Sequence, residues 1–345
     1  MTILQEKGRS MSLVYSLRMI AGLVASVAFV QQTLAHHVSV NGPPSQAGPI
    51  VTASPDTLRK GEVVLGVQTQ IINYEAFDGA ELEAIAAAGF EEVHNTDSAV
   101  VASVAVEYGL TEDLTIGLVV PFVSRNSIRE GELEAGAPEV DEFGDVDGFG
   151  DVSLQARYRL PAIDALKISV LAGLEIPTGE TRERQQDGRR FETEFQPGSG
   201  SWDPSLGLAV SHPFGPIMVT ANALYTLATE GSQDTDLGDN AALNIGAVYR
   251  IGQGAHVHDD GTFERHQAID LVLELNGEWQ DREEVRDVAD SNSGGTQVFL
   301  SPGVRYSSAD GWSSFASVGI PVHEDFRGVQ NDTDVRVTAG VGFAF

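Results

Sequence analysis

The chain has 345 residues, no cysteine and a formal net charge of −29. So acidic a chain is repelled by phosphates, which excludes nucleic acid as a partner. Without cysteine there is neither a disulfide framework nor a thiolate metal site, so the fold must be held by hydrogen bonds and packing alone.

The first 35 residues have the pattern of an export signal. Basic residues precede an apolar stretch and a small-residue cleavage site: Lys7, Arg9 and Arg18, then 19–30, then 33–35. The apolar stretch is too short to span a bilayer, so residues 1–35 are predicted to be a signal peptide. A start at Met11 stays an alternative, because the segment from that residue onward is already a complete signal.

Residues 36–61 follow the signal and precede the first strand-like run. They are predicted to lie outside the barrel wall described next, either as a short plug folded inward or as a periplasmic segment.

From residue 62 to 345 the sequence repeats one theme, a run of alternating apolar residues followed by a break. Near residue 270, Leu271, Leu273 and Leu275 oppose Asp270 and Glu274. Burying such carboxylates in a soluble sandwich would cost several kcal/mol each, by order of magnitude. A barrel in lipid solves the problem, since its apolar face is outside and its polar face meets a wet lumen.

The predicted fold is therefore an all-β, transmembrane, antiparallel up-and-down β-barrel of about twelve strands. The expected strands are 63–74, 98–110, 113–124, 149–160, 166–176, 203–213, 216–229, 240–252, 266–280, 296–307, 311–323 and 334–345.

The breaks between these strands alternate in length. Those after even-numbered strands are short, except for 252–264, and those after odd-numbered strands are longer and carry most of the acids. Bacterial barrels have short periplasmic turns and long outer loops, so the N-terminus is expected in the periplasm. The outer loop 126–148 is predicted to be a solvated acidic loop, because Asp145-Val146-Asp147-Gly148 lacks the remaining ligands of a calcium loop.

Aromatic residues support the same orientation. Four tyrosines with outward parity precede predicted periplasmic turns and would form a girdle at the membrane boundary: Tyr108, Tyr158, Tyr249 and Tyr306. The terminal Phe345 resembles the sorting signal of outer-membrane proteins, which implies periplasmic insertion machinery as a partner.

Three segments resemble the outer-membrane family named for the MetA pathway of phenol degradation. They are Phe149-Gly150-Asp151-Val152-Ser153-Leu154, Leu174-Glu175-Ile176-Pro177-Thr178-Gly179-Glu180 and Gln196-Pro197-Gly198-Ser199-Gly200-Ser201-Trp202-Asp203. The resemblance implies an outer-membrane transporter near catabolic or efflux functions, with aromatic or other small hydrophobic compounds as suggested cargo.

Charged residues with inward parity are the candidate pore-lining residues. They are Glu107, Arg157, Arg159, Lys167, Glu175, Arg250, Asp270, Glu274, Glu278, Arg305 and Arg336. They would form either a selective constriction or a salt-bridge network that fills a narrow barrel, and the sequence leaves both interpretations open.

Metal binding and catalysis have weaker signals. His256 and His258, two residues apart in a long turn, could chelate a transition metal, although a plain polar turn explains them as well. His94 and His212 show no evident serine and carboxylate partners, so no enzyme activity and no cofactor are predicted.

The predicted function is an outer-membrane channel in a Gram-negative bacterium, with membrane lipid and a small solute as partners. The alternative is a non-conducting barrel that binds cations or partners through its acidic outer loops.

Overall fold

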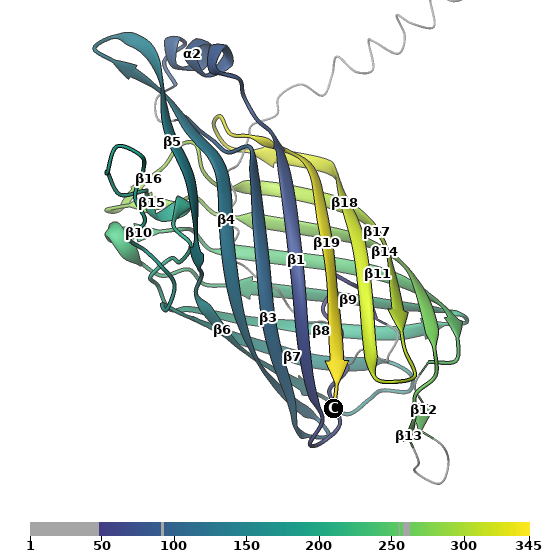
Figure 1. Cartoon of the computed structure of the whole chain (residues 1–345). Helices are drawn as coiled ribbons and strands as arrows, with labels where there is room; N and C mark the ends of the chain where they lie inside the picture. Colours follow the sequence, from purple (N-terminus) through teal and green to yellow (C-terminus); the bar gives the residue numbers. More distant parts are fainter. Residues whose placement is uncertain (1–47, 91–92, 255, 258–262) are drawn as a thin grey trace, which may run out of the picture.

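The computed structural model of the protein describes residues 48–90, 93–254, 256–257 and 263–345 (Figure 1). The predicted signal peptide lies outside the described residues. Within the described ranges, no helix has the length and apolar character needed to cross a bilayer.

Twelve antiparallel strands close into a barrel, as predicted. Each pairs with its neighbours in the chain, and β1 pairs with β19 to close the ring. The strands are β1 (Val63–Glu75), β3 (Ser98–Thr111), β4 (Leu114–Glu134), β6 (Val152–Arg159), β7 (Lys167–Ile176), β8 (Asp203–Phe214), β9 (Ile217–Thr226), β11 (Asn240–Gly252), β14 (Ala268–Gln280), β17 (Gly295–Ser307), β18 (Trp312–Phe326) and β19 (Asp332–Ala344).

The two faces of the wall differ as the alternation requires. On β14, Leu271, Leu273 and Leu275 are 49%, 50% and 43% exposed on the outside of the barrel, whereas Asp270 and Glu274 are 0% and 1% exposed. Packing of these leucines between two sheets would have indicated a soluble sandwich. An apolar outer face and a charged inner face instead suit a barrel surrounded by lipid.

The acidic stretch 126–148 is not the irregular loop that the sequence predicted. β4 continues to Glu134, and β5 (Ala137–Phe149) pairs with it to form a hairpin beyond the barrel wall. The hairpin is ordered because one of its faces packs Ile128, Phe143 and Val146 against Phe191 and Phe195 of a later loop. These five buried residues are called the loop core.

Short elements that the sequence did not reveal decorate the barrel. Asp78 caps helix α2 (Gly79–Ala87) through a capping box with Glu81. The others are β2 (Val93–Asn95), η2 (Thr193–Phe195), η3 (Ser232–Asp234), β10 (Thr235–Asp236), β12 (His256–Val257), β13 (Phe263–Glu264), β15 (Glu284–Val285) and β16 (Val288–Ala289). Below, the short-turn end of the barrel is the end where β3 meets β4, and the long-loop end is the opposite one.

Candidate functional site

Residues 48–61, the N-terminal segment, lie against the inner face of the barrel wall. The Glu274 carboxylate accepts the backbone N–H groups of Ile50, Val51 and Thr52 at 2.7–3.1 Å. The next residue, Ala53, donates its N–H to Asn222 Oδ1 at 2.9 Å. Three N–H donors on one carboxylate form a charge-assisted anchor for an otherwise irregular chain.

The rest of the segment is tied down as far as the short-turn end. Arg157 donates to the Asp56 carbonyl at 2.8 Å, and Lys167 Nζ lies 2.6 Å from the Asp56 carboxylate. Leu58, which is 0% exposed, donates its N–H to Thr115 Oγ1 at 2.8 Å. The segment therefore has hydrogen-bond partners on the wall from mid-height to the short-turn end.

Two more pairs of inward charges are hydrogen-bonded, and Arg305 contacts the N-terminal segment. Arg250 makes two 2.7 Å hydrogen bonds to Asp270, and Arg336 makes bonds of 2.6 and 2.9 Å to Glu278. Arg305 donates to the Pro49 carbonyl at 2.8 Å.

We call this set the lumen network, and its acids and bases are equal in number. The members are Asp56, Glu107, Asp270, Glu274 and Glu278 with Arg157, Lys167, Arg250, Arg305 and Arg336. Two further candidates lie apart from it: Arg159 pairs with Asp113 at the surface, and Glu175 is buried near the long-loop end. Whether any of these residues lines a conducting pore stays a prediction.

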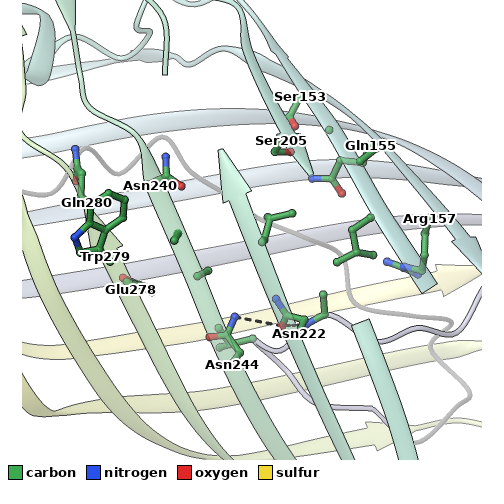
Figure 2. Close-up of a pocket in the computed structure, with 18 of the residues that line it drawn as sticks. Ser153, Gln155, Arg157, Ser205, Asn222, Asn240, Asn244, Glu278, Trp279 and Gln280 are labelled. Carbon is green, nitrogen blue, oxygen red and sulfur yellow. Dashed lines mark hydrogen bonds between the residues drawn. The ribbon is translucent and has the colours of Figure 1, made fainter. Parts of the chain in front are cut away.

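A cavity of about 190 Å³ lies between the N-terminal segment and the wall. Amides and hydroxyls line much of it, among them Gln155, Ser205 and Asn222, and Asn244 donates to Asn222 Oδ1 at 3.2 Å (Figure 2). Trp279 is also among the lining residues, although it shares the parity of the outward-facing Leu271, Leu273 and Leu275. The inward parity of these amides on their strands is the sequence signal that identifies them.

The three family-like segments meet at one buried carboxylate. Asp151, 3% exposed, accepts the N–H groups of Gly179 at 2.7 Å and Ser199 at 2.6 Å, and the Ser199 hydroxyl at 2.8 Å. A Cβ at Gly179 would lie 2.7 Å from the Gly150 backbone, and one at Gly198 would lie 2.7 Å from Gly179. Glycine is required here because the backbones approach so closely, and the junction fixes the rim at the long-loop end.

His94 lies beside three carboxylates, which the sequence did not reveal. Its Nδ1 lies 2.5 Å from Glu194, and its Nε2 lies 3.4 Å from Glu192 and 3.8 Å from Glu130. Burial lowers the pKa of His94, but these carboxylates outweigh it and raise the pKa to about 10. We call these four residues the imidazole cluster.

The structure describes most of the remaining histidine and aromatic candidates. His258 and the side chain of His256 lie outside the described residues. Tyr108, Tyr158 and Tyr249 are 40%, 50% and 46% exposed, and Tyr306 is half-buried against Trp312. Phe345 is 75% exposed. The tyrosine girdle and the sorting role of Phe345 stay predictions.

Comparisons with known proteins agree with this architecture. A model of the family described as "Putative MetA-pathway of phenol degradation" matches residues 85–331. Among solved structures, the COG4313 outer membrane channel from Pseudomonas putida F1 has a TM-score of 0.55 and 15% identity, over 84% of this chain and 97% of that one. The P. putida toluene transporter TodX has a TM-score of 0.44 and 12% identity, over 92% and 98%. A search of curated protein sequences gave no significant match.

Proposed function

Because the chain belongs to the family described as "Putative MetA-pathway of phenol degradation", we propose that it is an outer-membrane channel for small, partly apolar solutes. The closed barrel with an apolar outer face and a charged lumen supports this role, since such a wall suits lipid outside and water inside. The long-loop end would then face the exterior, and the short-turn end the periplasm.

The cavity is the observation that carries the proposal. Its volume of about 190 Å³ exceeds the roughly 150 Å³ of an engineered protein cavity that binds benzene, so one aromatic ring fits. Its lining combines the buried hydrophobic residues Leu171 and Phe326 with the amides of Asn222 and Asn244. An aromatic surface with a few hydrogen-bonding groups suits a ring that carries a hydroxyl or similar polar substituent.

Passage through the lumen would require the N-terminal segment to move. The cavity touches Val51 and Ala53, so a bound solute would contact the segment directly. The segment is held mainly through Glu274, Arg305 and Arg157, which makes these residues the proposed latch.

Two measurements test the proposal on the refolded full chain. Phenol should quench tryptophan fluorescence saturably, and a Trp279→Phe variant should lose most of the quenching while Trp202→Phe keeps it. Planar bilayers should show discrete conductance steps that phenol reduces. Quenching unaffected by Trp279→Phe would exclude the cavity as the solute site.

A non-conducting barrel is the second candidate, and the anchored N-terminal segment is the observation that favours it. Conductance in planar bilayers distinguishes the two candidates, because a channel should conduct at least when the N-terminal segment is deleted. No conductance from either the full chain or the deletion variant would favour the non-conducting barrel.

A further inference from the structure

The imidazole cluster lies in the loops at the long-loop end, apart from the lumen cavity. His94 comes from β2 and Glu130 from β4, where the two residues are paired in register. Glu192 immediately precedes η2 and Glu194 lies within it. Three segments that are distant in the chain thus bring four ionisable side chains together.

The imidazole is oriented by one carboxylate and faces two others. Nδ1 lies 2.5 Å from Glu194 Oε1, which leaves Nε2 toward Glu192 and Glu130. A metal-bound histidine typically has a carboxylate beside its other ring nitrogen, which fixes the tautomer and the ring orientation. The Nε2 atom is buried and makes no hydrogen bond.

The spacing of the facing atoms fits a small cation. Nε2 lies 3.4 Å from Glu192 Oε2 and 3.8 Å from Glu130 Oε1. Tetrahedral zinc with bonds of about 2.0–2.1 Å holds its ligand atoms roughly 3.3 Å apart, which is close to these two separations.

Burial makes the excess negative charge of the cluster costly. The side chains of His94, Glu130 and Glu194 are only 11%, 10% and 10% exposed, and the Phe195 ring packs edge-on against the imidazole at 4.9 Å. Like charges repel more strongly in such surroundings than in water.

Two further charged groups lie near the cluster. The Glu283 carboxyl interacts electrostatically with Glu192, Glu194 and His94, and burial raises its pKa well above the ordinary value. Arg125 interacts electrostatically with Glu194.

We propose that the imidazole cluster binds a divalent transition-metal ion of the zinc type, with His94 Nε2, Glu130 and Glu192 as ligands. Glu194 positions His94. The imidazole ligand argues against Ca²⁺ and Mg²⁺, which take oxygen ligands. The ion would tie β2, the β4–β5 hairpin and the η2 loop together over the loop core, whether or not the barrel transports a solute.

Zinc binding to the metal-stripped full chain, measured by isothermal titration calorimetry in detergent, tests this site. Glu192→Gln is the main variant, because that side chain is 57% exposed and its loss should leave the fold intact. It should weaken binding at least tenfold, and His94→Asn should abolish it. Glu132→Gln, two residues from Glu130 on the same strand, is the matched control and should bind zinc as the wild type does.

Other histidines require their own control. A His256→Asn/His258→Asn double variant should retain the site, and X-ray absorption of its zinc complex should show one imidazole nitrogen with oxygen ligands. Zinc affinity unchanged by both Glu192→Gln and His94→Asn would overturn the proposal, as would a coordination shell without imidazole.

Discussion

The lumen network and the imidazole cluster both gather buried charges, but they balance them differently. In the lumen, five acids meet five bases, and Glu274 also accepts backbone N–H groups. In the cluster, three carboxylates surround one imidazole. Buried charges need partners, so the lumen network is complete within the chain while the cluster calls for an external cation.

This contrast separates the charges that hold the N-terminal segment in the lumen from those proposed to bind a metal ion. The balanced lumen network holds the N-terminal segment in place, and removal of one residue of the network should loosen the segment. The stability of the loops around the imidazole cluster should instead depend on the positive charge that it takes up, either a proton or a metal ion.

Deletion of residues 48–58 should have the largest effect. The lumen network would lose Asp56 and the acceptor at Pro49, and the mid-height of the lumen would fill with water. We expect single-channel conductance in planar bilayers to rise several-fold. A circular dichroism spectrum that retains the strand signal is the control, and unchanged conductance would show that the segment is not the barrier.

Glu274→Gln should loosen the segment without removing it. The amide keeps one acceptor but loses the charge that three N–H groups share, at a cost of roughly 1–3 kcal/mol. Hydrogen exchange at Ile50 to Thr52 should accelerate accordingly. Glu278→Gln is the matched control, because Glu278 is an inward carboxylate that pairs with Arg336 and Gln297 on the wall. Equal acceleration of hydrogen exchange in both variants would contradict the proposal that Glu274 holds the N-terminal segment.

The metal-free imidazole cluster should respond to pH. The pKa of His94 is raised to about 10, so its stabilisation is complete below the ordinary pKa near 6.5 and is lost as pH rises to about 10. The charged groups around His94 are Glu130, Glu192, Glu194, Glu283 and Arg125, and burial raises the pKa of Glu283 well above its ordinary value.

Limited proteolysis of the β4–β5 hairpin, with a chelator present, should therefore accelerate between those pH values. His94→Asn should remove the dependence. A wild-type profile that stays flat would mean that the imidazolium does not stabilise the loops.

Arg159→Ala should have the smallest effect. Its partner Asp113 is 56% exposed, and exposed pairs contribute about 0–1 kcal/mol. We expect little change in thermal stability or ion selectivity, whereas Arg157→Ala, which removes a bond to the N-terminal segment, should change selectivity. Identical behaviour of the two variants would place both outside the conduction path.

The sequence alone determined the barrel and its two faces, because the alternation of apolar and polar residues along a strand is a local property. Apolar side chains on one face suit lipid, and polar side chains on the other suit water in the lumen. Leu271 and Glu274 show this, since their opposite environments follow from parity. The hairpin over 126–148 was missed because its apolar residues gain a partner only when Phe191 and Phe195 fold over them.

Only the tertiary structure decided which distant residues meet. Asp151 gathers Gly179 and Ser199, and His94 meets Glu192 and Glu194, across long stretches of chain that no local pattern connects. Barrel closure brings the ends of all twelve strands to one rim, so side chains from separate loops become neighbours there. The charge balance of the lumen network and of the imidazole cluster depends on those contacts.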